Sequence, residues 1–324
     1  MNRLLIVGND LQWELPASYA RSFGRCGVDV TLFDYYGLQT RWGARASSRV
    51  LREVARSAAR RVQAVHLVQA ARDVRPDAIP FVKCDDLPTL TYAALRRAVA
   101  GVKLAVYHPD SPFNVRFVRG PSHRRGLAQM RAVDAYFIWS QALVARIEHA
   151  GARNVHYVGF AADETYCKPM VLDAEERARF GSDVSFCGTW DEKRERWLEP
   201  LCASHLDVGL FGPDSWVTRC KTEVVRRRYR GILPLGPDVA RTVSGSRVTI
   251  NLLRQQNEGA ENMRTYEVPM CGGVMVAEHS DVQASLFRPG IEAFYATTPE
   301  ALRDEAIRVA SLPDDTLRAI GEAA

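Results

Sequence analysis

The sequence has little that marks a membrane-spanning or secreted protein. No run of about 18 apolar residues occurs, so we expect no membrane-spanning helix. The apolar residues 4–7 are too few for a signal peptide. The seven cysteines are odd in number and scattered, and none stands at zinc-ligand spacing with another Cys or a His. This pattern predicts reduced thiols in a cytoplasmic protein.

Motifs of several common enzyme classes are also absent. The sequence contains no GxSxG nucleophile elbow, no Walker A loop and no HExxH zinc motif. The loop after the first apolar run lacks the glycines of a GxGxxG fingerprint, which argues against an NAD-dependent enzyme. No Asp-x-Asp ends an expected strand, and we interpret the acidic pairs 85–86 and 314–315 as helix-start caps. We therefore expect neither a metal ion nor a cofactor.

The 324 residues are more than one hydrophobic core usually holds. Short apolar runs alternate with helical patterns, as in doubly wound parallel sheets, and this alternation breaks once, over residues 159–169. We expect an α/β protein with two Rossmann-like domains facing a cleft, residues 1–165 and 166–324. The expected strands are 3–7, 29–33, 77–81, 103–107, 134–138, 155–158, 183–187, 207–211, 247–252, 273–276 and 291–295. The expected helices are 16–26, 46–72, 87–100, 122–132, 140–150, 191–203, 237–244, 262–270, 281–286 and 298–311.

Charge is unevenly distributed between the two halves. Residues 1–165 contain 23 Lys and Arg against 14 Asp and Glu, a net of +9, whereas residues 166–324 contain 20 against 24, a net of −4. The basic excess follows one expected helix at intervals of three or four residues: Arg41, Arg45, Arg49, Arg52, Arg56, Arg60 and Arg61. A solvated helix face explains this spacing, and so does an anionic acceptor or an anionic membrane surface. No motif or interleaved aromatic residue supports a nucleic acid partner.

The segment 262–273 is the strongest candidate site. Arg264 and Glu267 are three residues apart and share a helix face, and Asn262 precedes them at the expected helix start. Free backbone N–H groups and one guanidinium suit a phosphate, and a carboxylate one turn later suits the hydroxyls of a sugar. Gly272 and Gly273 then break the helix before a short strand. The combination predicts a nucleotide-sugar site, while a solvated amphipathic helix remains an equal alternative.

Two further loops of the second half follow expected strands, where ligands of parallel sheets bind. Gly188 and Thr189 follow the strand 183–187, and Arg194 in the next helix would reach a diphosphate. Gly212 follows the strand 207–211 and precedes Trp216, which we interpret as a core residue rather than a base-stacking one. A tight turn followed by a solvated basic helix is the alternative for the first loop.

The first half offers two candidate loops for an acceptor. Gly8, Asn9 and Asp10 follow the first expected strand. His108 and Asp110 follow the strand 103–107, where they would serve as a catalytic base and its partner. A loop histidine hydrogen-bonded to the backbone is the alternative.

Several separated motifs together resemble a known family. They are Phe-x-Gly at 186–188 with an Arg in the next helix, Leu-Phe-Gly-Pro before a Trp, Gly-Ile-Leu-Pro-Leu-Gly-Pro, Val-Thr-Ile-Asn-Leu, and Asn-x-Arg-x-x-Glu-x-x-x-Cys-Gly-Gly at 262–273. Their order, over about 140 residues from 183 onwards, resembles the CgeB-like branch of the group 1 glycosyltransferases. The first half resembles that branch more loosely, through Tyr-His-Pro-Asp-Ser-Pro at 107–112.

The resemblance implies the GT-B fold, with a nucleotide-sugar in the C-terminal domain and the acceptor in the N-terminal one. It implies that Glu267 binds the ribose, that Gly188 and Arg194 lie on the diphosphate side, and that Gly272 and Gly273 form the turn under the donor. It also implies retention of the anomeric configuration.

The sequence departs from the family pattern in two places. A second Glu, expected seven residues before the ribose carboxylate, falls at Ala260, with Glu261 and Glu258 nearby. The family's usual final helix, which packs back onto the N-terminal domain, is also expected to be missing.

From these patterns we expect a metal-independent glycosyltransferase whose Arg264 and Arg194 stabilise the leaving diphosphate. The acceptor would be anionic or close to a membrane, and the protein cytoplasmic or peripheral at the inner face of the membrane. Two alternatives stay open. One is a nucleotide-sugar epimerase on the same fold, and the other is a non-catalytic protein that binds through its basic first domain.

Overall fold

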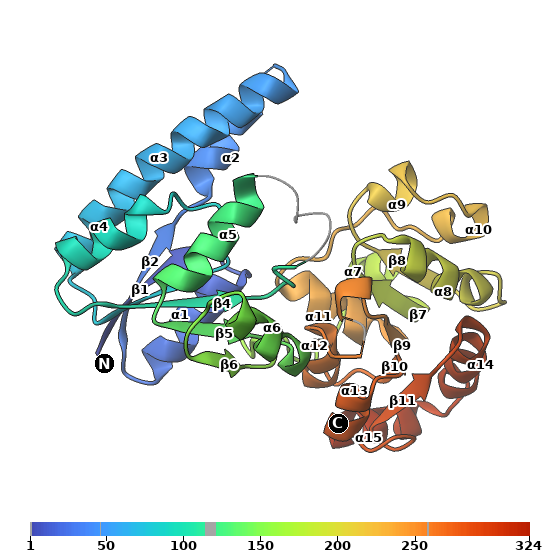
Figure 1. Cartoon of the computed structure of the whole chain (residues 1–324). Helices are drawn as coiled ribbons and strands as arrows, with labels where there is room; N and C mark the ends of the chain where they lie inside the picture. Colours follow the sequence, from blue (N-terminus) through green and yellow to red (C-terminus); the bar gives the residue numbers. More distant parts are fainter. Residues whose placement is uncertain (1, 46, 114–120, 258) are drawn as a thin grey trace. The chain divides into compact units, whose positions relative to one another are not determined.

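The computed structural model describes residues 2–45, 47–113, 121–257 and 259–324 (Figure 1). The chain divides into two compact units, Met1–Gly159 and Phe160–Ala324, and each contains one parallel sheet. The domain boundary predicted from the sequence, at 165/166, falls a few residues inside the second unit.

The first unit has six parallel strands in the order β2-β1-β3-β4-β5-β6. Its elements are β1 (Arg3–Gly8), α1 (Leu15–Arg25), β2 (Asp29–Asp34), α2 (Gly37–Ala44), α3 (Arg49–Val74), β3 (Ala78–Val82), α4 (Leu90–Ala98), β4 (Lys103–His108), α5 (Pro121–Ala132), β5 (Ala135–Ile138), the 3-10 helix η1 (Gln141–Leu143), α6 (Val144–His149) and β6 (Val155–Tyr157). The chain leaves β1 for β2 on one side and returns to β3 on the other, so the topological switch point lies between β1 and β3.

Helix α3 is much longer than the sheet that it covers. Its 26 residues span about 39 Å at 1.5 Å per residue, whereas the six residues of β1 span about 20 Å. The side chain of Ser48 accepts a hydrogen bond from the N–H of Leu51 and so begins the helix. The buried residues of α3 start only at Ala59, so its first two to three turns extend beyond the sheet (Figure 1).

The second unit has five parallel strands in the order β11-β10-β9-β7-β8. Its elements are α7 (Ala174–Phe180), β7 (Ser182–Cys187), α8 (Glu192–Cys202), β8 (Val208–Phe211), α9 (Ser215–Thr218), α10 (Glu223–Arg226), α11 (Pro237–Ser244), β9 (Ser246–Asn251), the 3-10 helix η2 (Gln255–Asn257), α12 (Arg264–Met270), β10 (Met275–Glu278), α13 (Asp281–Leu286), β11 (Ala293–Ala296), α14 (Pro299–Ala310) and α15 (Asp314–Ala323). Here the switch point lies between β7 and β9.

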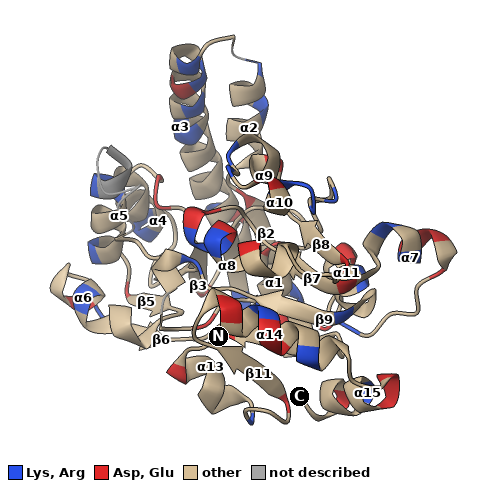
Figure 2. Ribbon diagram, turned by 90° about the vertical axis from the view of Figure 1, so that its right-hand side faces the viewer, with Lys and Arg blue, Asp and Glu red and all other residues tan. Residues whose placement is uncertain are grey.

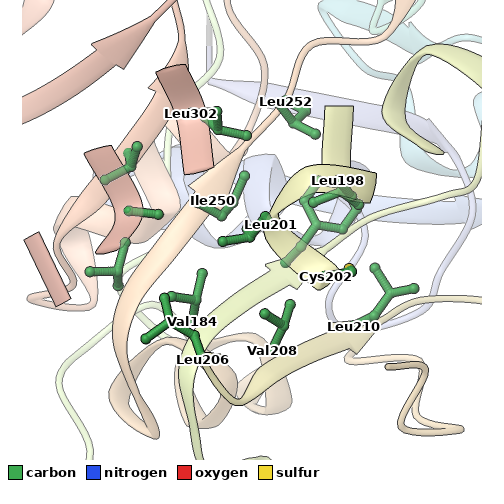
Figure 3. Packing of buried hydrophobic residues seen from close by; sticks show 14 of the residues in the cluster. Val184, Leu198, Leu201, Cys202, Leu206, Val208, Leu210, Ile250, Leu252 and Leu302 are labelled. Carbon is green, nitrogen blue, oxygen red and sulfur yellow. The ribbon is translucent and has the colours of Figure 1, made fainter. Parts of the chain in front are cut away.

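Alternate residues of these strands supply the two cores of the second unit. On one face, Val184 and Ile250 pack with Leu198 of α8 and Leu302 of α14 (Figure 3). On the other face, strand β10 presents Met275 to a second cluster that includes residues of α11 and α12. Helices therefore cover both faces, and loops at the carboxyl edge remain for a site.

The structure confirms the predicted class of α/β protein with two doubly wound parallel sheets. Each predicted strand is present, within about two residues of its predicted bounds. Helices α2, α7, α9, α10 and α15 were not predicted. Within the described parts of the chain, no helix has both the length and the apolar character needed to cross a membrane.

Candidate functional site

The predicted donor residues gather at the switch point of the second unit. The loop after β7 contains Gly188 and Thr189, and the loop after β9 contains Leu252. Arg194 hydrogen-bonds with both loops, and Arg264 at the start of α12 contacts Cys187 at the end of β7. In parallel α/β sheets, ligands bind outside the carboxyl ends of the strands at such a point. The sequence prediction and the topology therefore select the same place.

Arg264 and Glu267 form an ion pair across one turn of α12, as their spacing predicts. Nη1 of Arg264 contacts the carboxylate of Glu267, and Nη2 donates to Sγ of Cys187 over 3.2 Å. Nε of Arg264 is buried and has no hydrogen-bond partner among the described residues. Because an unpaired buried donor is costly, this nitrogen is suited to receive an anionic ligand atom.

Arg194 is held by the protein itself. Nη1 donates to the carbonyl oxygen of Thr189 over 3.0 Å, and Nη2 donates to the carbonyl oxygen of Leu252 over 2.8 Å. Its guanidinium also lies over the ring of Phe186, 5.5 Å from the centroid. Burial lowers the pKa of Arg194 to about 10. In this arrangement Arg194 positions the two loops. Its Nε is buried and has no hydrogen-bond partner among the described residues, so its contact with a diphosphate stays a prediction.

The two glycines after β7 and β8 allow their loops to pack closely. A Cβ on Gly212 would lie 2.2 Å from the carbonyl oxygen of Gly188, so no side chain fits there. Nε1 of Trp216 donates to the same Gly188 oxygen over 2.8 Å. Trp216 is fully buried, which confirms the prediction that it is a core residue.

Asn262 lies just before α12 and joins the start of this helix to the sheet. Its side-chain oxygen accepts from the N–H of Thr265 over 3.2 Å, and its side-chain N–H donates to Oδ1 of Asn251 over 2.8 Å. Asn251 at the end of β9 also donates to Oε1 of Gln283 over 2.9 Å. This buried network sets the orientation of the helix that presents Arg264 and Glu267.

The Gly272–Gly273 turn holds α12 close to its neighbours. Gly272 has φ of 70°, a backbone conformation that favours glycine. A Cβ on Gly273 would lie 2.2 Å from Cγ1 of Val243 in α11. A Cβ on Gly321 in α15 would similarly lie 2.2 Å from the carbonyl oxygen of Gly272. The turn therefore allows α12, α11 and α15 to pack against one another.

A buried pair that the sequence analysis missed lies at the same edge. Nζ of Lys193, in the first turn of α8, is 2.6 Å from Oε1 of Glu278 at the end of β10. The other carboxylate oxygen of Glu278 accepts from the N–H of Leu253 over 3.2 Å. The one available signal was that a charged residue ends an otherwise apolar strand.

At the position of the expected second Glu, Ala260 is buried. The neighbouring Glu261 is 1% exposed, and the hydroxyl of Tyr266 donates to its Oε1 over 3.4 Å. Glu258 lies outside the described residues. Among the described residues, Glu261 is therefore the carboxylate nearest in the sequence to position 260, where the second Glu was expected.

In the first unit, His108 ends β4 and is 2% exposed. Its Nδ1 lies 2.7 Å from the backbone oxygen of Asp110, and its Nε2 lies 3.8 Å from Oδ2 of Asp85. The carboxylate of Asp110 pairs with Nζ of Lys83 over 2.7 Å. The carboxylate that faces the imidazole is therefore that of Asp85, from the loop after β3, and not that of Asp110 as we had predicted.

The interpretation of residues 85–86 as helix caps is wrong. Helix α4 begins at Leu90 after Thr89, and Asp85 and Asp86 belong to the loop after β3. Burial acts to raise the pKa of Asp85, but the hydrogen bond and charge of His108, together with Lys83, lower it overall. Asp85 is thus a carboxylate that stays ionised in a largely buried place.

Gly8 ends β1, and Asn9 and Asp10 follow it, on the other side of this unit's switch point. A Cβ on Gly8 would lie 2.5 Å from Cγ of Pro16, so Gly8 permits the close approach of α1. Oδ1 of Asn9 accepts from the N–H of Leu11 over 3.3 Å, and Asp10 is exposed. The acceptor role of these residues stays a prediction.

Among residues 2–45, 47–113, 121–257 and 259–324, no group of three or more His, Cys, Asp or Glu side chains could hold a metal ion.

Comparisons with known proteins bear on the fold and on the second unit. Residues 193–324 match a family model described as glycosyl transferase-like. HepE of Anabaena, in complex with UDP and glucose, is 12% identical, with 100% of this chain and 93% of that chain covered and a TM-score of 0.64. Sucrose-phosphate synthase of Thermosynechococcus elongatus is 13% identical and has a TM-score of 0.64. The match covers 100% of this chain and 93% of that chain.

A UDP-forming trehalose-phosphate synthase of Burkholderia xenovorans is 14% identical and has a TM-score of 0.61. The match covers 99% of this chain and 94% of that chain. A comparison with curated proteins finds no match to this sequence. The similar structures share the GT-B architecture, and the family match covers much of the unit that carries the predicted donor residues. The chain therefore has the GT-B fold, and its residues 193–324 match a glycosyl transferase-like family model.

Proposed function

We propose that this protein is a glycosyltransferase that moves a sugar from a nucleoside diphosphate sugar to an acceptor hydroxyl. One observation carries the proposal: at the switch point of the second sheet, Arg264 presents a buried, unpaired Nε beside the carboxylate of Glu267. A guanidinium suits a phosphate oxygen, and a carboxylate one turn along the helix suits the ribose hydroxyls of the same nucleotide. The glycosyl transferase-like match over residues 193–324 supports the same function.

In this proposal each group has a separate task. Nε of Arg264 donates to a phosphate oxygen, and Glu267 accepts from the ribose hydroxyls. The bond from the anomeric carbon to the diphosphate breaks, the diphosphate leaves with the electron pair, and a bond to the acceptor oxygen forms. Arg264 stabilises the growing negative charge, and such electrostatic stabilisation is often the largest single contribution to catalysis.

The acceptor side of the reaction belongs to the first unit. In the tautomer of His108 whose proton is on Nδ1, this nitrogen donates to the backbone oxygen of Asp110 over 2.7 Å, and Nε2 takes the proton of the acceptor hydroxyl. Nε2 is buried and has no hydrogen-bond partner among the described residues, and the carboxylate of Asp85, 3.8 Å away, stabilises the imidazolium.

The finer assignments are part of the same proposal. They are membership of the CgeB-like branch, transfer without a metal ion, and retention of the anomeric configuration. Arginine side chains meet the charge of the diphosphate in place of a metal. UDP-sugars are the first donors to test, because HepE of Anabaena has been solved with UDP and with UDP-glucose.

Thermal-shift measurements with UDP, GDP, dTDP, CDP and their sugars test the proposal, with NAD as a control. A ligand that binds only the folded state stabilises it by about 2.7 kcal/mol at 100 times its dissociation constant. We expect one nucleotide family to raise the melting temperature and NAD to leave it unchanged.

Turnover assays with the stabilising donor then separate the alternatives. Product that forms only with an added acceptor supports the transferase. Conversion of the donor without any acceptor would indicate an epimerase. The absence of a shift with every nucleotide at millimolar concentration would contradict the proposal.

A further inference from the structure

The hairpin formed by α2 and the first turns of α3, residues 37–61, carries most of the basic excess of the first unit. It contains seven arginines and one acidic residue, Glu53, a net charge of +6. Glu53 pairs with Arg60, which also lies 3.5 Å from Asp86. Arg41, Arg45, Arg49, Arg52, Arg56 and Arg61 have no acidic partner within 4.0 Å among the described ion pairs. Their charge is therefore uncompensated within the described part of the unit.

These arginines lie away from the sheet because the first turns of α3 extend beyond it. The first turns of the helix cover no strand, and α2 is the element that packs beside them (Figure 1). A Cβ on Gly43 of α2 would lie 2.9 Å from Nε of Arg56, so the two helices meet through an arginine side chain and a glycine. Figure 2 shows the basic residues along α2 and α3 in blue.

Large aliphatic side chains lie exposed among these arginines. Val50 is 73% exposed, Leu51 54% and Val54 61%. Their spacing places Val50 and Val54 on the same side of the helix, with Leu51 adjacent. Exposed apolar residues gathered in one place usually mark a surface that binds a partner.

A hollow lies against the same turns. It has a volume of about 510 Å³, and Val50 and Val54 line it together with Arg49, Glu53, Ser57, Arg60 and Arg125 of α5. Guanidinium groups beside aliphatic side chains match the phosphate of a lipid head group and the start of its acyl chains.

We infer that the α2–α3 hairpin docks this protein on an anionic lipid bilayer. Arginines on a helix with aliphatic residues between them bind the interface of such a bilayer, where the charges meet the head groups and the apolar side chains enter the acyl boundary. A nucleic acid or an acidic polysaccharide would use the arginines but would leave the exposed valines and leucine in water. The apolar residues therefore favour the lipid surface, and the inference does not depend on the proposed transferase activity.

Vesicle flotation with the full chain tests the inference. Vesicles of phosphatidylcholine containing 30 mol% phosphatidylglycerol are compared with pure phosphatidylcholine, at low and at high salt. We expect binding only to the anionic vesicles, and weaker binding at high salt because the charges are exposed.

Two variants separate the charge from the apolar residues. Arg45→Gln/Arg49→Gln/Arg52→Gln should lower the partition coefficient by on the order of a hundred-fold, because each basic residue adds to the affinity for an anionic surface. Val50→Ser/Leu51→Ser/Val54→Ser should lower it by about ten-fold or more, through loss of apolar burial. All six positions are exposed, so both variants should keep the melting temperature of the parent protein.

A matched control removes the same charge elsewhere on the unit. Arg72→Gln/Arg97→Gln/Arg153→Gln changes three exposed arginines outside the hairpin and should leave the partition coefficient within two- to three-fold of the parent value. An equal loss in this control would overturn the inference, because general charge would then explain the binding. No binding of the parent protein to anionic vesicles at low salt would also overturn it. So would heparin binding that exceeds vesicle binding and persists in the Val50/Leu51/Val54 variant.

Discussion

The carboxyl edges of the two sheets are built alike but present different charged side chains. Both lie at the switch point of a doubly wound parallel sheet, where loops from non-consecutive strands meet. In the second unit this edge presents the guanidinium groups of Arg194 and Arg264. In the first unit it presents the imidazole of His108 and the carboxylates of Asp85 and Asp110.

In the proposed reaction, this difference gives one architecture two chemical roles. Buried cations, as at the second edge, are suited to stabilise an anion such as a diphosphate. A histidine beside an ionised carboxylate at the first edge is suited to accept a proton from a neutral hydroxyl. Function is therefore set by the side chains at the strand ends and not by the sheets. Four substitutions test the comparison, starting with the largest expected effect.

Loss of the imidazole would test the first edge. His108→Ala should lower kcat by about 10²- to 10⁴-fold, the usual contribution of a general base, and should leave the dissociation constant of the donor unchanged. Steady-state kinetics together with calorimetric titration of the donor measure the two quantities. His149→Ala, at an exposed position, is the matched control. Turnover within a few-fold of the parent value would remove His108 from the mechanism.

Loss of the guanidinium would test the second edge. Arg264→Ala should lower kcat by about 10²- to 10³-fold, because the leaving diphosphate loses one charged hydrogen-bond donor. Arg196→Ala changes an exposed arginine of α8 and should leave kcat unchanged. The melting temperatures of both variants show whether folding is preserved. Equal activity of the two variants would contradict the assigned role of Arg264.

Glu267 should determine whether the site recognises ribose. The parent protein should bind the stabilising nucleoside diphosphate about ten- to a hundred-fold more tightly than its 2′-deoxy form, because a hydrogen bond to a carboxylate is lost. In Glu267→Gln this preference should largely disappear, whereas the exposed-site control Glu199→Gln should retain it. An unchanged preference in Glu267→Gln would show that another group binds the ribose.

Glu195 stabilises the structure next to the carboxyl edge of the second sheet but is not one of the candidate site residues. Its carboxylate accepts from the N–H groups of Lys221 and Thr222 over 2.8 and 2.7 Å, and from Nε1 of Trp190 over 2.7 Å. Glu195→Gln should lower the free energy of unfolding by about 2 kcal/mol, since the amide offers one acceptor atom in place of two. Under conditions in which Glu195→Gln is folded, its affinity for the donor should be close to that of the parent protein.

The pH dependence of stability gives a second measure of Glu195. Burial acts to raise its pKa, but the hydrogen bonds from Thr222, Trp190 and Lys221 lower it overall. A carboxyl whose pKa is lower in the folded state stabilises fully above its unfolded value, near 4.3, and loses that contribution as the pH falls through the folded value. Denaturant melts from pH 6 to 3 should therefore show a steeper loss of stability in the parent protein than in Glu195→Gln. Parallel curves would contradict this account.

Most of the fold could be predicted from the sequence because its strands are buried on both faces. Such strands form short apolar runs, and the predicted runs lie within about two residues of the strands. Most of the helices that were not predicted are short. Helices α9 and α10 have four residues each, and so few residues give no detectable helical period.

The candidate site could be predicted only in part. The pair Arg264 and Glu267 was predictable because both residues lie on one helix turn. The partners of Arg194 and His108 were not, because the carbonyl of Leu252 and the carboxylate of Asp85 come from distant parts of the chain. Sequence spacing carries no signal for such contacts, since the sheet order decides which loops meet.

The double attachment of Arg194 limits how this edge can evolve. One guanidinium binds the carbonyl oxygens of Thr189 and Leu252, so the loops after β7 and β9 are linked. An insertion in either loop is compatible with the fold only if it leaves the bonded carbonyl in place. New ligand preferences in this unit should therefore arise first in loops that Arg194 does not join, such as that after β8.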